Sequence, residues 1–348
     1  MVKLFLIFEF KIYLMKKLII PFILVVFAGC SPEKPLVKIR FTGETQGTYY
    51  TVTYFDNKGR DFQMQVDSLL EAFDRSVSLW VPGSVISRIN RNDTAVVTDT
   101  VFREMFRRSG EVFEATGGAF DPTIGPLVNA WGFGFKEGMK IDEKVIDSLL
   151  PLVDFGNVRM ETGKVIKSDP RIHIDFNAIA QGYSVDLTGE FLESKGIDSY
   201  LVDVGGEVLA VGTKPDGGYW TVGIEKPADS AMAERKLKAR VSLKDKALAT
   251  SGNYRKYYIR DGVRYSHTLD PASGYPVQHP LLSVTVLAND CATADAYATA
   301  FMVMGLERAK EFLEGADDLE AYFIYSGPEE ELLTHYSRGF AESLTEEY

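Results

Sequence analysis

The spacing of apolar residues along the chain indicates both helices and strands. Around 61–76, for example, Phe62, Val66 and Phe73 fall on one helical face, and the stretch at 100–116 ends at two glycines, as helices commonly do. We predict helices where apolar residues recur at three- and four-residue spacing: 61–76, 100–116, 180–195, 291–305 and 306–315.

Shorter stretches alternate between apolar and polar residues and are predicted as strands. These are 39–55 (a strand or hairpin interrupted at 43–48), 172–176, 200–204, 207–212, 219–225, 237–243, 254–260, 263–269, 282–287 and 320–325. Asp261-Gly262 is a typical two-residue hairpin turn. We read 78–90 as a loop in which Ser84 starts a short helix, 117–134 as a long loop, and the end from Glu342 as frayed. The pattern favours an α+β fold, with helices flanking a largely antiparallel sheet.

The first residues are typical of a targeting segment. Lys16-Lys17 precedes an apolar run over 18–27, and Ala28-Gly29-Cys30 follows, like the lipobox of a bacterial lipoprotein. We expect a cleaved signal over 1–29 and lipidation of Cys30, although an uncleaved anchor is the alternative. Met15 begins a better signal than Met1 does. The division expected is therefore signal 1–29, tether 30–38, domain 39–335 and acidic tail 336–348.

Charge and motif content exclude several classes of function. The whole chain has 38 basic and 49 acidic residues, and removal of 1–29 takes away four lysines and one glutamate, which leaves a net charge of −14. A nucleic-acid partner is therefore not expected. With Cys30 lipidated, Cys291 is the only thiol, so no intrachain disulfide can form. The chain has no Rossmann, P-loop or HExxH motif and no Cys/His zinc spacing.

The alanine-rich stretch 291–305 carries the most suggestive pair of polar residues. Asp295 and Thr299 are four residues apart and so share one helical face. A carboxylate and a hydroxyl among small side chains can bind a hard cation and leave room for a phosphate. The alternative is a buried helix in which Asp295 caps and Thr299 bonds to the preceding turn.

Further polar residues gather in glycine-rich corners. Asp175 ends a predicted strand, Ala178 lies in the turn that follows, and Gln181 is in the first turn of the next helix, where an anion can bind. His267 stands in the loop after the predicted hairpin, near Ser273-Gly274. Taken singly, each also has a structural interpretation: a helix cap, a hydrogen-bonded loop histidine and an ordinary turn.

Seven segments occur in the order typical of one family. They are GETQGTYYTV, SLWVPGSVISRIN, GGAFDPTIGPLVNAWGFG, IDFNAIAQGYSVD, YLVDVGGEVLAVG, HTLDPASGYPV and CATADAYATAFMVMG. In this respect the chain resembles the ApbE-type FAD:protein FMN transferases, from about residue 41 to 326. The resemblance implies the ApbE-like fold.

The resemblance also implies roles for individual residues. Asp295, Thr299 and the backbone carbonyl of Ala178 would bind Mg²⁺, which also contacts the FAD pyrophosphate. The FAD site would be lined by Gln46, Trp80, Phe120, Asp121, Thr123, Asp175, Gln181 and Leu269. Three positions depart from the pattern: many relatives have Met in place of Gln46 and Tyr in place of Trp80, and some carry an acid in place of Ala298.

The implied reaction is Mg²⁺-dependent transfer of FMN from FAD to a protein hydroxyl, with release of AMP. His267 is the candidate base, and Asp295 is the other catalytic candidate. The implied acceptor is a Thr, sometimes a Ser, on a partner such as a subunit of a sodium-pumping quinone reductase or an Rnf-type complex. With the lipid anchor, this places the protein on the bacterial cell envelope, facing the periplasm or the cell exterior. An FAD pyrophosphatase that uses water as acceptor, and a non-catalytic FAD-binding lipoprotein, are the alternatives; an envelope scaffold leaves the polar corners unexplained.

Overall fold

The computed structural model describes residues 35–134, 141–227, 236–253, 257–260 and 263–348. The signal 1–29, Cys30 and the Asp261-Gly262 turn lie outside these ranges. Within them, none of the helices combines the length and the apolar character that a membrane crossing requires.

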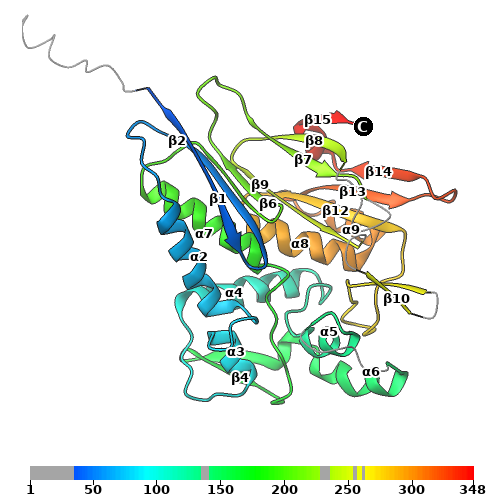
Figure 1. The fold of residues 1–348 in the computed structure, drawn as a ribbon. Helices are drawn as coiled ribbons and strands as arrows, with labels where there is room; N and C mark the ends of the chain where they lie inside the picture. The colour runs from blue at the N-terminus through cyan, green and yellow to red at the C-terminus, as the bar shows by residue number, and fades with distance from the viewer. Residues whose placement is uncertain (1–34, 135–140, 228–235, 254–256, 261–262) are drawn as a thin grey trace, which may run out of the picture.

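The central element is an eight-stranded sheet in which every neighbouring pair is antiparallel. Its strands, in spatial order, are β1 (Val37–Thr45), β2 (Thr48–Asp56), β5 (Tyr200–Val204), β6 (Glu207–Val211), β9 (Lys246–Gly252), β12 (Leu281–Ala288), β13 (Glu320–Ser326) and β14 (Leu332–Tyr336). Figure 1 shows β1 and β2 as a long hairpin at one edge. The predicted α+β class with a large antiparallel sheet is confirmed.

Smaller sheets surround this one. They are β7 (Trp220–Glu225) with β8 (Leu237–Leu243) and β15 (Leu344–Glu347), then β3 (Val158–Glu161) with β4 (Lys164–Lys167), and β10 (Tyr257–Arg260) with β11 (Val263–Ser266). In the last pair Arg260 faces Val263.

The helices lie mainly on one side of the large sheet and below it in the view of Figure 1. They are α2 (Gln63–Val77), α3 (Val85–Asn90), α4 (Thr100–Ala115), α5 (Gly125–Trp131), α6 (Glu143–Leu149), α7 (Ala180–Ser194), α8 (Cys291–Met304), α9 (Leu306–Leu313) and α10 (Arg338–Ser343), with short 3₁₀ turns at Leu150–Leu152 and Phe155–Asn157. Ser84 caps α3, as expected, by accepting a hydrogen bond from the Ser87 amide at 3.1 Å.

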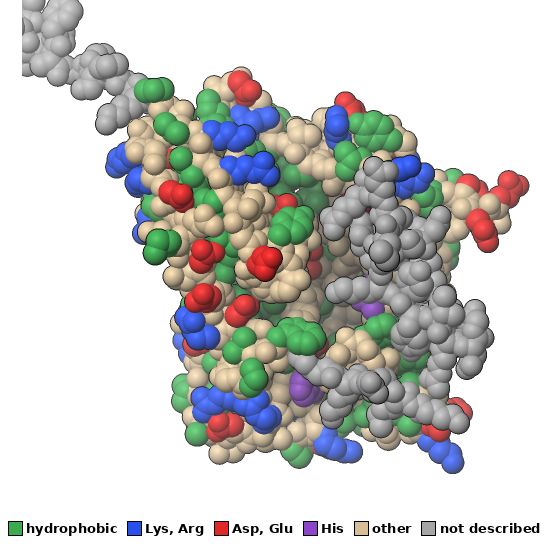
Figure 2. Space-filling view, in the orientation of Figure 1, with side chains coloured by type: hydrophobic (Ala, Val, Ile, Leu, Met, Phe, Trp, Pro, Cys, Tyr) green, Lys and Arg blue, Asp and Glu red, His purple; other side chains and the backbone are tan. Residues whose placement is uncertain are grey.

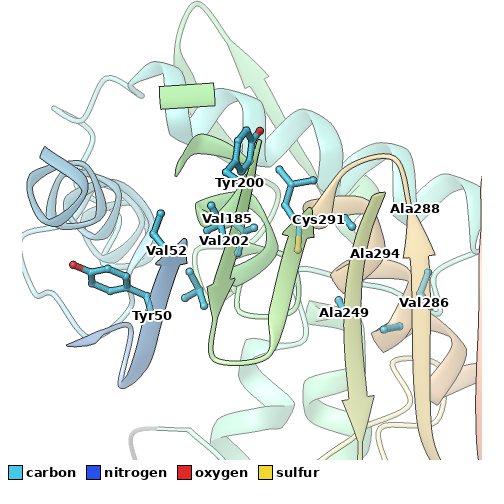
Figure 3. Close-up of a cluster of buried hydrophobic side chains, with 14 of the residues drawn as sticks. Tyr50, Val52, Val185, Tyr200, Val202, Ala249, Val286, Ala288, Cys291 and Ala294 are labelled. Carbon is cyan, nitrogen blue, oxygen red and sulfur yellow. The ribbon is translucent and has the colours of Figure 1, made fainter. Parts of the chain in front are cut away.

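Both faces of the large sheet are buried. In β9, Ala247 and Ala249 face the cluster that includes α7 and α8, and Leu248 between them faces the cluster formed with β7 and β8. This is the period of two expected of a strand. Figure 3 shows the first cluster, in which Cys291 and Ala294 of α8 pack against side chains of the central strands.

The helix α8 belongs to two hydrophobic cores at once. Its residues in the core with the large sheet are Cys291, Ala294, Ala298, Phe301 and Met302. Its residues in the core with α3, α4 and the 172–179 segment are Ala292, Ala296 and Ala300. The alanines let backbone on both sides approach closely, which explains why so many occur in one helix.

Three expectations from the sequence are wrong. Residues 172–176 form no strand, because the Asn90 side chain and the Pro122 carbonyl take up the backbone groups of Ile174 and Asp175. The loop at 117–134 contains α5, which ends at Gly132 in the left-handed conformation. The end of the chain is not frayed: α10 and β15 are ordered there, and Phe340 is buried.

Candidate active site between two helices

The two polar residues of α8 project at the boundary between its two cores. A helix turns about 100° per residue, which places Asp295 and Thr299 between the alanines that face the sheet and those that face α4. Only 7% of the Asp295 surface is exposed. The expectation that these residues share one face is confirmed, and that face is the seam between two packed layers.

The start of α8 is fixed by acids from its own turn and from α7. Asp290 caps the helix by accepting from the Thr293 amide at 2.9 Å, and Arg108 of α4 pairs with Asp290 at 2.8 Å. The buried Asp186 of α7 accepts from the amides of Cys291 (2.7 Å) and Ala292 (2.8 Å). Burial raises the pKa of Asp186 to about 7, partly offset by these hydrogen bonds. These hydrogen bonds therefore fix the position of the start of α8 against α7.

Asp295 is oriented by the backbone of α7. The Gly182 amide donates to Asp295 Oδ2 at 3.0 Å. A Cβ atom on Gly182 would lie 2.3 Å from the Cys291 carbonyl oxygen and 2.8 Å from the Asp295 Cβ. Only glycine allows so close an approach of the two helices, and this approach brings the amide within hydrogen-bonding distance of the carboxylate.

A backbone carbonyl lies free just before the same helix. Gly182 is the third residue of α7, and the first amides of a helix have no acceptor within it. Here the amide donates to Asp295, and no described residue donates to the Ala178 carbonyl. A carboxylate bonded to Gly182 and an unpaired carbonyl four residues before Gly182 are oxygen donors of the kind that Mg²⁺ prefers.

The third expected ligand, Thr299, is bonded to the sheet. Its Oγ1 lies 3.1 Å from Ser251 Oγ of β9, and either hydroxyl can donate. If Ser251 accepts, a lone pair of Thr299 stays available for a cation. Among the described residues, no three His, Cys, Asp or Glu side chains form a metal cluster. The candidate ligands for a cation are therefore one carboxylate (Asp295), one hydroxyl (Thr299) and one backbone carbonyl (Ala178). These residues fit Mg²⁺.

The electrostatics of the site favour a cation. Burial raises the pKa of Asp295 above its usual range, and the hydrogen bond from Gly182 offsets this only in part. Glu207 of β6 also has a raised pKa, caused first by burial and then by the charge of Asp295. Two carboxylates thus share a poorly solvated region, where positive charge would stabilise both.

Gln181 lies beside these acids. Its Nε2 donates to the Val204 carbonyl at 2.7 Å and to Glu207 Oε2. An amide NH₂ has two protons, so both are used and only Oε1 is left to contact a substrate. If Gln181 lines the FAD site, as predicted, its side chain can therefore contact FAD only as a hydrogen-bond acceptor.

A second group of predicted residues is joined to the start of α7. The Asp175 amide donates to the Pro122 carbonyl at 2.7 Å, which ties this segment to the loop with Phe120, Asp121 and Thr123. Asp121 Oδ1 accepts from the amide (2.7 Å) and hydroxyl (2.6 Å) of Thr123. Burial raises the pKa of Asp121 to about 6 and also raises the pKa of Asp175. The side chains of Phe120 and Thr123 are buried, so they support the conformation of this loop from its inner side.

Gln46 and Trp80 occupy two different surroundings. Gln46 sits in the β1–β2 turn with φ of 52°, and its buried Nε2 has no hydrogen-bond partner among the described residues. A Cβ atom on Gly205 would meet both Gln181 Nε2 and the Thr48 side chain, two residues after Gln46, so this turn lies near Gln181. Trp80 is 66% exposed.

The loop after β11 contains two further predicted residues, His267 and Leu269. His267 lies against the Phe133 ring, with centroids 6.3 Å apart, and Leu269 is buried with Leu127 and Trp131. Figure 2 shows this face of the molecule hollowed at its middle, with acidic side chains beside the hollow. The role of His267 as a base stays a prediction.

The sequence interpretation did not single out three residues that the geometry brings in. Glu207 and Ser251 contact Gln181 and Thr299, and Asn90 holds Ile174 through both its backbone groups. The signal for Glu207 was present, since it is an acid that follows two glycines at the start of an apolar strand. For Ser251 and Asn90 no local pattern gave their partners, which lie 48 and 84 residues away.

Comparison with known proteins gives concordant matches. A family model described as the ApbE family matches residues 46–323. A Vibrio cholerae serotype O1 protein named FAD:protein FMN transferase is 37% identical over 304 residues, covering 84% of this chain and 88% of that protein. The structure titled flavin transferase ApbE from Vibrio cholerae has a TM-score of 0.79 at 32% identity, covering 89% of this chain and 100% of that one. The apo flavinyl transferase ApbE of Pseudomonas stutzeri has a TM-score of 0.79 at 33% identity, covering 88% and 97%.

Proposed function

This chain belongs to the ApbE family and is an FAD:protein FMN transferase, and from this premise we propose that it moves FMN onto a Thr or Ser hydroxyl of a partner protein, with Mg²⁺ and with release of AMP. One observation carries the metal dependence. The Gly182 amide orients the Asp295 carboxylate, and no described residue donates to the Ala178 carbonyl just before the helix. A helix start arranged in this way offers two oxygen ligands.

In the proposed reaction the acceptor oxygen attacks the phosphorus on the FMN side of the pyrophosphate. The bond to the AMP phosphate breaks, and AMP leaves. Mg²⁺, when bound, would offset the negative charge that develops on the phosphate oxygens. His267 is proposed to take the proton from the attacking hydroxyl. Asp295 and Thr299 would hold the ion, and the positive end of the α7 dipole would favour the pyrophosphate near the start of this helix.

The partner and the location are part of the same proposal. The acceptor is a Thr- or Ser-bearing protein, such as a subunit of a sodium-pumping quinone reductase or an Rnf-type complex. We further propose that Cys30 is lipidated and that the enzyme is anchored to the cell envelope, facing the periplasm or the exterior. The basic, apolar and small-residue pattern before Cys30 supports this location.

The test is to incubate the purified protein with FAD, Mg²⁺ and a purified candidate acceptor. We expect an FMN-sized mass gain on the acceptor and an equal amount of AMP. AMP formed with free FMN and no labelled acceptor would instead identify an FAD pyrophosphatase. FAD binding without AMP, in the presence of Mg²⁺ and of an acceptor that a known relative modifies, would contradict the proposed reaction.

A further inference from the structure

Glu207 is a partly buried acid that contacts Gln181 at the start of α7. It is the first residue of β6 and follows the turn at Gly205 and Gly206. Its Oε2 accepts from Gln181 Nε2, and the same nitrogen donates to the Val204 carbonyl at 2.7 Å. The strand end therefore holds the Gln181 side chain from two directions.

This contact is linked to the proposed metal ligand through the backbone. Gln181 is followed by Gly182, whose amide donates to Asp295 Oδ2 at 3.0 Å. The Gln181 side chain packs closely against the Gly205 backbone, because a Cβ atom on Gly205 would lie 2.2 Å from Gln181 Nε2. A shift of the Gln181 side chain would therefore move the first turn of α7, and with it the amide that orients Asp295.

The charges around Glu207 and Asp295 also favour a cation. No arginine or lysine of the described chain forms an ion pair with Glu207 or Asp295. Burial and the charge of Asp295 hold the pKa of Glu207 well above its usual range. Two acids so placed repel one another, and a divalent cation nearby would relieve that repulsion.

On the basis of the proposed function, we propose that Glu207 is a positioning residue of the Mg²⁺ centre. It fixes the Asp295 carboxylate through Gln181 and Gly182, and it places a second negative charge beside the ion. Partners of metal ligands that act in this way typically change metal affinity by about 10- to 100-fold when they are replaced. Glu207→Gln, which keeps the shape and removes the charge, is expected to weaken metal binding within that range.

Mn²⁺ serves as the probe, with free Mn²⁺ measured by electron paramagnetic resonance during titration of the full chain. The variants are Glu207→Gln and Gln181→Met, which breaks the same link at similar volume. Glu193→Gln is the matched control, since Glu193 lies at the far end of α7 and accepts from the Tyr200 hydroxyl at 3.0 Å. Melting temperatures are measured on the same samples.

We expect weaker Mn²⁺ binding in Glu207→Gln and Gln181→Met, and wild-type binding in Glu193→Gln. In the transfer assay, high Mg²⁺ should restore much of the lost rate to Glu207→Gln. Unchanged Mn²⁺ affinity in the two site variants, even with a lower melting temperature, would show that the contact only supports the fold and would overturn this inference. Failure of the wild-type protein to bind Mn²⁺ would instead count against the metal site of the proposed function.

Discussion

The closest backbone contact of the site gives a prediction whose sign can be worked out. In Gly182→Ala the new methyl group would lie 2.3 Å from the Cys291 carbonyl oxygen and 2.7 Å from its carbon. Ordinary contact needs a full ångström more, and the obstacle is backbone, which cannot rotate away. The α7 and α8 helices must therefore separate, and the hydrogen bond from residue 182 to Asp295 must lengthen.

The magnitudes favour destabilisation. Replacing a helical glycine with alanine contributes at most about 1 kcal/mol of stability. Overpacking costs about 1–3 kcal/mol, and weakening a hydrogen bond to a buried carboxylate costs about 1.5–3 kcal/mol. We expect a net loss of roughly 2–4 kcal/mol in the free energy of unfolding, which for a chain of this size corresponds to a fall in Tm of about 3–6 °C. FMN transfer by the folded fraction should fall as well.

Gly110→Ala is the matched control. Gly110 lies inside α4, and a Cβ atom there would meet only the Phe155 ring at 3.4 Å, so the substitution should leave stability unchanged or raise it. Tm by calorimetry and AMP release are measured for both variants. If Gly182→Ala were as stable and as active as Gly110→Ala, the close approach of α7 and α8 would not be what positions Asp295.

Three further predictions concern the surroundings of the site. Asn90→Ala removes both hydrogen bonds to the Ile174 backbone, so we expect a loss of about 1–3 kcal/mol in the free energy of unfolding, measured by denaturant titration. We also expect a higher KM for FAD in steady-state kinetics, and an unchanged KM would show that Asn90 does not support the FAD site. Trp80→Ala should weaken FAD binding by about 1 kcal/mol if the exposed ring stacks on the flavin, and equal FAD affinity by fluorescence titration would refute this. Cys30→Ser should move the protein out of the membrane fraction or leave its signal uncut, whereas normal processing with an unchanged membrane fraction would contradict lipidation.

Most element positions followed from local periodicity. The strands at 200–204 and 237–243 match the predicted bounds, and α4, α7 and α8 differ from them by one residue at the C-terminal end. The segment 172–176 misled because Ile172, Ile174 and Phe176 alternate as in a strand, yet their partners are a side chain and a loop carbonyl. The strand β9 was missed since its buried residues on one face are alanines, which give little contrast with polar neighbours.

The candidate site followed from the sequence only in part. The four-residue spacing predicted that Asp295 and Thr299 share a face, and the structure agrees. No pattern along the chain predicts that the Gly182 amide donates to a side chain 113 residues away. Such contacts are set by how α7 packs on α8, and tertiary packing of this kind is invisible to local periodicity.

The measurement that tests the account most directly is Tm and AMP release on the same samples of Asp295→Asn and Thr299→Val. Each change keeps the side-chain shape and removes one ligand property, a charge in the first and a hydroxyl in the second. We expect both variants to fold with Tm near that of the wild-type protein and to lose most AMP release, with the larger loss in Asp295→Asn and partial rescue of Thr299→Val by high Mg²⁺. Variants with lowered Tm whose folded fraction releases AMP at nearly the wild-type rate would show instead that these residues serve only the packing of α8.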